Sequence, residues 1–300
     1  MTQQTPHAPT PLAGISYFQP DQEYRLTGRD GAVDMLWGGW PIPLQDADYR
    51  VALEQGAPDY DQVGRGLYQA LRTNPDCVYG AQYAAVLQQA YPHVIAEIGG
   101  ETIMLDAKEI DTPYLERKVT LLKIMALMEP DNAGLWREIG RALMERGSRL
   151  DAAHLAVQSW YGAEKYLARA LELEADDFAT RYQFGEVQYV LGHYEQAVDA
   201  WEALLPRCGE QEAGRLAARV EAIRRSELPK VPAVDYLTAL AVAFEQREHD
   251  LYETVAIVDD VLNDTVFTAQ FPMAGLLAFQ ERCYRELNLP EKAAAVRARG

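Results

Sequence analysis

The sequence predicts an all-α protein built from helical hairpins, with a small irregular segment near its N-terminus. Three patterns in the sequence lead to this fold class. Residues 178–205 carry two apolar stripes at helical spacing with Gly192 between them, a pattern typical of a helical hairpin. A related pattern occurs upstream, and nearly every segment after Asp46 has helical periodicity. Apolar residues make up 48% of the 300 residues, which is enough for a sizeable core.

The hairpin at 178–205 has small residues where its two helices must cross. Gly185 on the first helix has no Cβ to hold the backbones apart, and Ala197 is the small residue on the second. Tyr194 and Trp201 fill the space beside them. The apolar stripes consist of Phe184, Val187 and Leu191 on the first helix and Val198, Trp201 and Leu205 on the second.

This alternation of small and bulky residues, with glycine before an aromatic residue in LGHYEQA (191–197), resembles the tetratricopeptide repeat (TPR), a helix-turn-helix unit of about 34 residues. One such hairpin cannot bury both of its apolar faces alone, so stacked neighbours are expected. The resemblance implies a TPR-like right-handed superhelix of helical hairpins.

A second copy lies upstream, split in two. Gly140 precedes Gly185 by 45 residues, whereas Leu167 precedes Trp201 by 34 residues. The difference, 45 minus 34, is an insertion of 11 residues within 148–162, and its apolar content predicts that it extends one or both helices. The other matched pairs are Ile139 with Phe184, Leu143 with Gln188, Gly147 with Gly192, Ala163 with Ala197, and Ala170 with Leu204.

The chain divides into four expected regions. Proline, glutamine and threonine in the first residues are typical of a disordered tail. Further along, MALMEPDN (125–132) ends as TPR repeats do, with Pro130 stopping the helix. The regions are 1–20, a disordered tail; 21–110, an N-terminal capping region with an irregular segment and then helices; 111–229, TPR-like repeats; and 230–300, C-terminal helical hairpins.

The irregular segment covers residues 15–43, where glycines and prolines interrupt short apolar runs. This composition favours a small hairpin or an extended wrap over a helix. Trp37 and Trp40 flank a Gly-Gly pair there. They form either a ligand-stacking platform or part of a cap that covers the exposed end of the solenoid.

Helices are expected from residue 45 onward. Asp46 or Asp48 would cap the first and Gly56 would end it, Asp59 or Asp61 would cap the second, and the third would end before Pro92. For VIAEIGGETIML (94–105), a helix ending at Gly99 and a loop to residue 111 is favoured over a hairpin about Gly99–Gly100.

The C-terminal part begins with a helix at 210–228 that has a basic tip, followed by a linker containing prolines. A hairpin-like pair of helices follows it. In the last segment, LNLPEKA (287–293) echoes LGHYEQA, with Asn288 at the place of the glycine and Ala293 at the place of Ala197.

Composition disfavours several classes of partner. The net charge of −17 repels phosphate backbones and anionic lipid, so neither nucleic acid nor membrane is expected. Such a surface serves either solubility or acidic docking. The chain has no uninterrupted apolar run of about 18 residues and no secretory signal, which predicts a cytoplasmic protein. The three cysteines are expected to be reduced.

Motifs for catalysis are absent from the sequence. The five histidines lack metal-binding or nucleophile-activating spacing, and no phosphate-binding glycine loop, HExxH or GxSxG occurs. The closest acid/base group, His249 and Asp250 near Glu253, is interpreted as a solvated surface. We therefore expect no catalytic residues, no metal and no cofactor, and a protein that is not an enzyme.

In TPR proteins the ligand generally lies in the concave groove lined by the first helix of each hairpin. Arg137 and Arg141 are one turn apart there, so they either converge on a carboxylate, or Arg141 pairs with Glu145 or Glu186. The lysine and asparagine set of carboxylate-clamp members is absent. The groove residues that the resemblance implies are Arg137, Arg141, Met144, Tyr182, Glu186 and Tyr189.

The sequence therefore predicts a non-enzymatic scaffold or adaptor that binds a peptide or protein segment in the concave TPR groove. Two alternatives stay open. One is an assembly or secretion chaperone that holds a client protein. The other is an enzyme or small-molecule sensor that uses a pocket at the N-terminal segment.

Overall fold

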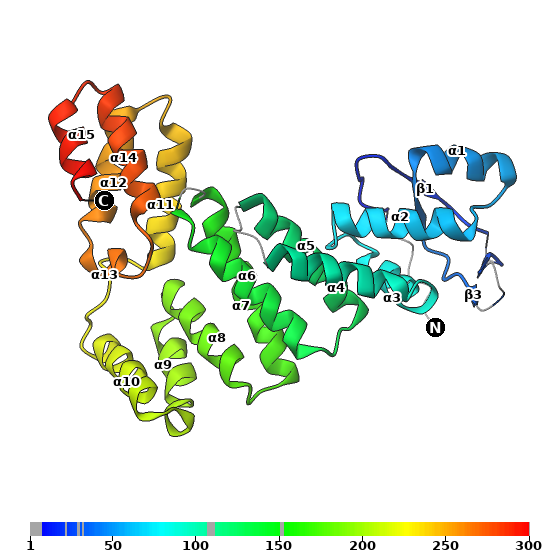
Figure 1. Ribbon diagram of the computed structural model, residues 1–300, viewed down its shortest axis with the longest axis horizontal. Helices are drawn as coiled ribbons and strands as arrows, with labels where there is room; N and C mark the ends of the chain where they lie inside the picture. The colour runs from blue at the N-terminus through cyan, green and yellow to red at the C-terminus, as the bar shows by residue number, and fades with distance from the viewer. Residues whose placement is uncertain are drawn as a thin grey trace. The chain divides into compact units, whose positions relative to one another are not determined.

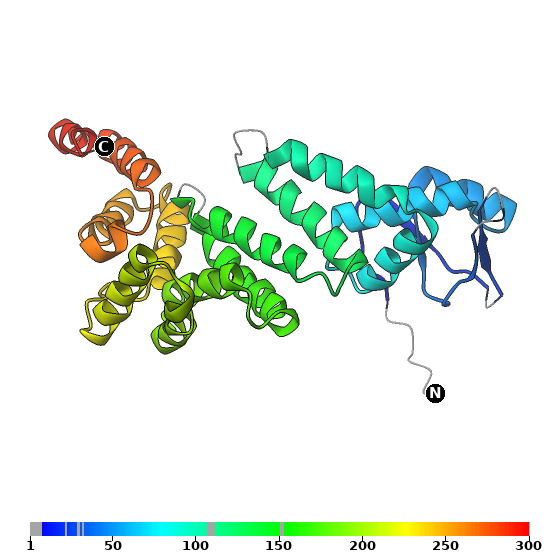
Figure 2. The ribbon, with the colours of Figure 1, turned by 60° about the horizontal axis from the view of Figure 1, so that its bottom comes forward.

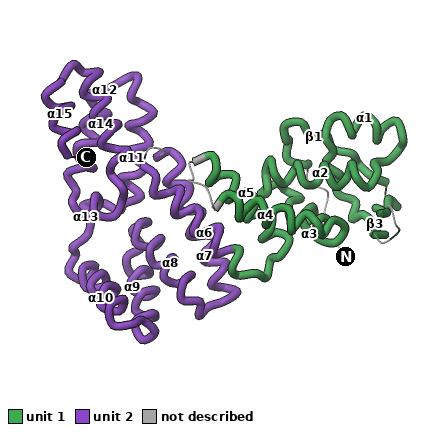
Figure 3. The backbone as a smooth tube through the Cα atoms, viewed as in Figure 1, with its two compact units in different colours: residues 1–135 green, residues 136–300 purple. Residues whose placement is uncertain are grey.

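A computed structural model of the protein describes residues 8–21, 23–28, 31, 33–106, 112–150 and 153–299 (Figure 1). Over these residues the chain is mostly helical with four short strands, which confirms the all-α class. The chain forms two compact units, residues 1–135 and 136–300 (Figure 3). No described helix is both long and apolar enough to cross a membrane.

Unit 1 combines short strands with helices. Strand β1 pairs with β4 and β2 with β3, both antiparallel, which confirms the small hairpin expected within residues 15–43. The elements are β1 (Ile15–Phe18), β2 (Arg25–Thr27), β3 (Asp34–Leu36), β4 (Ile42–Gln45), α1 (Asp46–Gln55), α2 (Tyr60–Thr73), α3 (Gly80–Ala90), α4 (His93–Asp106) and α5 (Thr112–Met128).

Strand β1 lies within residues 1–20, so the prediction of a disordered tail is wrong for this part. Ile15 is buried, and Phe18 pairs across the ladder with Ile42, which is fully buried. The backbone groups of β4 gain a hydrogen-bonding partner in β1, and this pairing orders residues that have little structural preference of their own. The predicted disorder of residues 1–7 lies outside the described residues.

The strands belong to the core of unit 1 because β4 lies directly on α2. A Cβ at Gly66 would stand 1.9 Å from the Pro43 carbonyl oxygen, so only glycine permits this approach. The hydroxyl of Tyr83 donates to the Pro41 carbonyl at 2.8 Å, and its side chain is buried. The strand region and the helices therefore share one core.

Two of the predicted helix boundaries are confirmed, and a third, the start of α1, differs. Gly56 ends α1 with φ of 81°, and Asp59 caps α2 in a capping box with Gln62. Gln45 is the N-cap residue of α1, and Asp46 and Asp48 lie in its first turn instead. Their carboxylates are favourable there because the N-terminal end of a helix carries partial positive charge.

Helix α4 runs through Gly99 and Gly100, so the predicted helix end at Gly99 is wrong. Val94, Ile98 and Leu105 form a buried stripe at helical spacing, and α4 packs on α5. Burial of such a stripe outweighs the low helix propensity of two glycines, which is about 1 kcal/mol each. Residues 107–111 of the expected loop lie outside the described residues.

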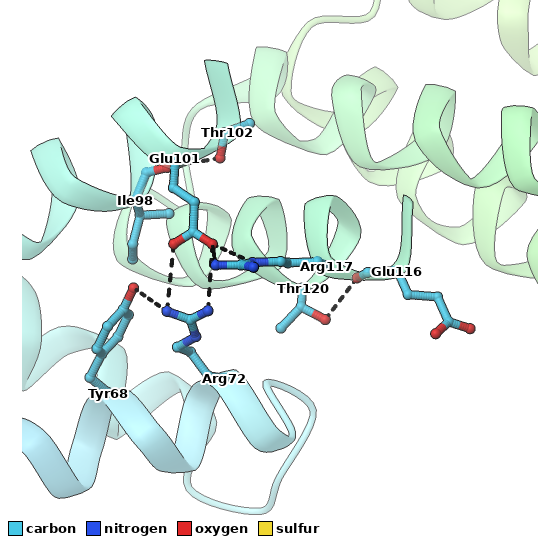
Figure 4. Close-up of polar contacts among 8 residues, drawn as sticks. All are labelled: Tyr68, Arg72, Ile98, Glu101, Thr102, Glu116, Arg117 and Thr120. Carbon is cyan, nitrogen blue, oxygen red and sulfur yellow. Dashed lines mark hydrogen bonds and ion pairs between the residues drawn. The ribbon is translucent and has the colours of Figure 1, made fainter. Parts of the chain in front are cut away.

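Ion pairs also hold α4 beyond the glycines. Glu101 accepts from Arg72 of α2 at 3.5 Å and pairs with Arg117 of α5 (Figure 4). The guanidinium of Arg72 also lies 5.4 Å from the centroid of the Tyr68 ring. One carboxylate thus joins three helices, and it reaches both arginines only because α4 continues past Gly100.

Gly100→Ala tests the continuous helix. Gly100 is exposed and has no atom within 4 Å of the position of an added Cβ. Alanine should raise the free energy of unfolding by about 0.5–1 kcal/mol, because it favours helix where glycine does not. Urea denaturation followed by circular dichroism measures this change. A loss of stability would contradict a helix at this position.

The packing of α5 sets the boundary of unit 1. We expected the repeats to begin near residue 111, but α5 packs against α3 and α4, and its buried Leu121, Ile124 and Met128 belong to the same core. The division of the chain therefore falls after Leu135.

Unit 2 is a series of helices joined by short connections (Figures 1 and 2). Its elements are α6 (Ala133–Gly147, which begins in unit 1), α7 (Ala153–Leu173), α8 (Phe178–Val190), α9 (Tyr194–Glu202), the 3-10 turn η2 (Leu205–Arg207), α10 (Glu210–Arg224), α11 (Ala233–Gln246), α12 (Leu251–Leu262), α13 (Thr265–Thr268), α14 (Ala274–Glu286) and α15 (Pro290–Arg297). Helix α7 has 21 residues and begins inside 148–162, which confirms that the insertion extends a helix.

Two hairpins of unit 2 cross through matched positions. A Cβ at Gly185 of α8 would stand 2.3 Å from Nε1 of Trp201 on α9. A Cβ at Gly140 of α6 would stand 2.6 Å from Cγ of Leu167 on α7. In both hairpins a glycine on the first helix accommodates a bulky, fully buried residue of the second. The correspondence inferred from the sequence is therefore present in the packing.

The last hairpin, α14 with α15, follows the same plan with other residues. Asn288 has φ of 57°, which matches the φ of 83° at Gly192, and both residues reverse the chain between two helices. At the same offset of 96 residues from Gly185 and Trp201 lie Glu281 and Arg297, which form an ion pair of 2.6 Å. An ion pair thus joins the helices where the earlier hairpin uses close packing.

Gly185→Leu should lower the free energy of unfolding by about 1–3 kcal/mol or more, because its side chain would enter the space of Trp201. The matched control is Gly214→Leu, at an exposed position of α10 with no atom within 4 Å of the added Cβ. Chemical denaturation of both variants measures the difference. Equal midpoints would show that Gly185 is not at a helix crossing.

Hydrogen bonds to Asp264 link the segment that precedes α11 to the start of α13. Its carboxylate accepts from the backbone N–H of Lys230 at 2.8 Å, from the Tyr236 hydroxyl at 3.0 Å, and from the N–H groups of Val266 and Phe267, both at 3.0 Å. Burial alone would raise the pKa of Asp264, but these hydrogen bonds outweigh it and hold the pKa below its ordinary value.

Asp264→Asn should destabilise unit 2 by about 1–3 kcal/mol at neutral pH, because the amide nitrogen cannot accept the same bonds. The folded pKa is lowered, so the stabilisation by the carboxylate is present above the ordinary carboxyl pKa and is lost as pH falls through the folded pKa. The difference in denaturant midpoint between wild type and variant should therefore become smaller in acid. A difference that stays constant would contradict the role of the charged form.

Candidate functional site

The candidate site is a pocket of about 690 Å³ in unit 2. It is lined by residues of α6, α7, α8 and α10 and by residues 269–271 after α13. The resemblance implied that the first helices of successive hairpins would line a groove, and α6 and α8 are those helices. Helix α9 packs against both α8 and α10.

Four of the six residues expected in the groove line this pocket, namely Arg141, Met144, Glu186 and Tyr189. Arg137 does not line it, because its guanidinium bonds to Asp177, the N-cap residue of α8, at 3.3 Å. Tyr182 lies beside Arg219, and burial raises the pKa of its hydroxyl.

Arg219 of α10 is one of the pocket residues that the sequence did not indicate. It pairs with Glu186, and its guanidinium carbon lies 4.1 Å from the centroid of the Trp201 ring and 5.3 Å from that of Tyr189. Cation–π contacts of this kind hold a guanidinium in place while leaving its edge free for hydrogen bonds. The helix crossing at Trp201 is thereby connected directly to the pocket.

The pocket carries charges of both signs. The two arginines expected to converge on the carboxylate of a ligand both pair with Glu138 of the protein itself, Nε of Arg137 at 3.6 Å and Nε of Arg141 at 2.8 Å. Within the pocket Arg141 and Arg219 are balanced by Glu145 and Glu186. Net charge therefore gives the pocket no general preference for anions.

Aromatic side chains make the apolar part of the pocket. Trp160 and Phe271 meet edge to face, with ring centroids 6.3 Å apart, and Nε1 of Trp160 donates to the Gly147 carbonyl at 3.0 Å. Polar groups lie next to them: Gln270 donates to the Tyr189 hydroxyl at 3.4 Å. The buried Oε1 of Gln183 accepts from no group in the described part of the chain. The pocket is amphipathic, with fixed rings and adaptable amides.

Other candidates for chemistry have structural roles. Asp250 caps α12 by accepting from the Glu253 N–H at 2.9 Å, which explains the His249–Asp250–Glu253 group. Burial raises the pKa of the Cys77 and Cys283 thiols, so it disfavours reactive thiolates there. Across the described ranges, no group of three or more histidine, cysteine, aspartate or glutamate side chains is arranged to hold a metal ion.

Trp37 and Trp40 pack on unit 1 and offer no stacking platform. Trp37 is buried, and its Nε1 donates to the Trp40 carbonyl at 2.7 Å. The Trp40 ring covers Gly38, where an added Cβ would stand 1.5 Å from a ring carbon. The glycine pair therefore lets one tryptophan fold back over the chain.

Comparison of the sequence with models of known protein families gives no match, and comparison with characterised proteins gives none either.

Proposed function

We propose that this protein is a non-enzymatic interaction protein, a TPR-like scaffold or adaptor, that binds an extended peptide segment in the pocket of unit 2. The observation that carries the proposal is the meeting of Arg141, Met144, Glu186 and Tyr189 in one pocket. The matched crossings at Gly140 and Gly185 support the TPR-like register from which these residues were inferred. A cytoplasmic location is part of the same proposal.

The lining determines the kind of peptide. Met144, Trp160 and Phe271 suit one apolar side chain, and such contacts supply most of the energy at small interfaces. Arg141 and Glu145 offer one charge of each sign, which favours a peptide with polar side chains of both signs over a uniformly acidic one. Rigid aromatic walls bind at low cost in conformational entropy.

The test starts from a displayed library of random peptides, selected on the full-length protein and then synthesised for titration. Arg141→Ala and Met144→Ala should each weaken binding of a selected peptide by about 1–2 kcal/mol, as modest interface hot spots do. The effect of Arg141→Ala should shrink as salt rises, whereas that of Met144→Ala should not. Isothermal titration calorimetry at two ionic strengths measures both effects.

The control variant is Glu195→Ala, at an exposed position of α9 that does not line the pocket. It should bind the peptide as wild type does. If selection yields no peptide, or if both pocket variants bind the selected peptides like wild type, the proposed function is wrong.

A further inference from the structure

A second pocket of unit 2 has a different chemistry. It has a volume of about 210 Å³ and lies where α7, α11 and α14 meet. At about 30 Å³ for each water-sized group, this volume accommodates a small oxyanion and the first atoms attached to it. It is lined by His154, Phe244, Arg247, Gly275, Phe279 and Arg282.

The lining contains three basic side chains and no carboxylate, although the protein carries a net charge of −17. The guanidinium carbons of Arg247 and Arg282 each lie 5.9 Å from the centroid of the Phe279 ring. Cation–π contact with one phenylalanine therefore places both guanidinium groups at the pocket.

Each of the two arginines keeps a group without a partner among the described residues. Arg247 pairs with Glu286, yet its buried Nε has no acceptor within the described residues. Arg282 is exposed, and its guanidinium has no carboxylate partner among the same residues. Guanidinium groups recognise phosphate and carboxylate oxygens through paired N–H donors, so these groups suit an oxyanion.

The rest of the pocket supports the same ligand. Phe244 and Phe279 meet edge to face, with ring centroids 4.2 Å apart, and form an apolar wall. Gly275 is the second residue of α14, whose N-cap residue Met273 makes no side-chain cap. Long-range repulsion by the acidic surface is screened beyond about 8 Å at physiological ionic strength, so the nearby positive groups dominate inside the pocket.

We infer that the pocket among α7, α11 and α14 binds a phosphate monoester, with the phosphate at Arg247 and Arg282 and the attached organic group on the phenylalanine wall. This site is separate from the peptide pocket and shares no lining residue with it. This inference can therefore be tested independently of the proposed function.

The test is titration of the full-length protein with phenyl phosphate at constant ionic strength, followed by calorimetry. Saturable binding at one site is expected, and it should be tighter than binding of inorganic phosphate because the ring adds apolar contact. Arg282→Gln should weaken binding at least tenfold, and Arg282→Lys should retain part of it, because a point charge replaces the planar fork. A phosphotyrosine pentapeptide that binds tighter than phenyl phosphate would identify a phosphorylated protein as the source, and weaker binding a free metabolite.

Two controls make the result decisive. Arg285→Gln removes an arginine from the same helix that pairs with Glu281 at 2.5 Å, and it should leave binding unchanged. Arg141→Ala, in the peptide pocket, should also bind phenyl phosphate as wild type does. Absence of saturable binding, equal binding by Arg282→Gln and wild type, or loss of binding in Arg141→Ala would each overturn the inference.

Discussion

The close approach of α8 and α9 at Gly185 is the constraint on which the pocket of unit 2 depends. Because Gly185 has no side chain, the Trp201 indole lies between the helices and is fully buried. Arg219 of the next helix stacks on that indole and reaches Glu186 on α8. A glycine therefore determines the position of a tryptophan, and the tryptophan determines where a charged residue of the pocket lies.

Matched positions of three hairpins carry two kinds of contact. Gly185 accommodates Trp201, Gly140 accommodates Leu167, and the last hairpin joins its helices through an ion pair. Close packing of a large apolar group excludes water and is specific in shape, whereas an ion pair at a partly exposed position contributes little stability. The hairpin of α14 and α15 thus has a partly exposed ion pair at the positions that correspond to Gly185 and Trp201.

Arginine has two distinct roles in unit 2. In the peptide pocket, Arg141 and Arg219 are each paired with a glutamate, so their charges are neutralised before any ligand arrives. In the pocket of α7, α11 and α14, Arg282 lies on an aromatic ring without a carboxylate beside it among the described residues. The first arrangement favours mixed contacts with a peptide, and the second favours an anion.

The sequence by itself determined the features that arise within one hairpin or one turn. These features follow from residues close together in the chain, whose steric and hydrogen-bonding demands are local. They are the chain reversal at Gly192, the end of α1 at Gly56, the cap at Asp59 and the crossing of α8 with α9. Only the tertiary structure decided the rest. Helix α4 passes through two glycines because its buried stripe packs on α5, and these long-range contacts outweigh local propensity. Arg137 bonds to Asp177 and does not line the pocket, whereas Arg219 lines it and pairs with Glu186. A long arginine side chain has several carboxylates within reach, and packing selects among them.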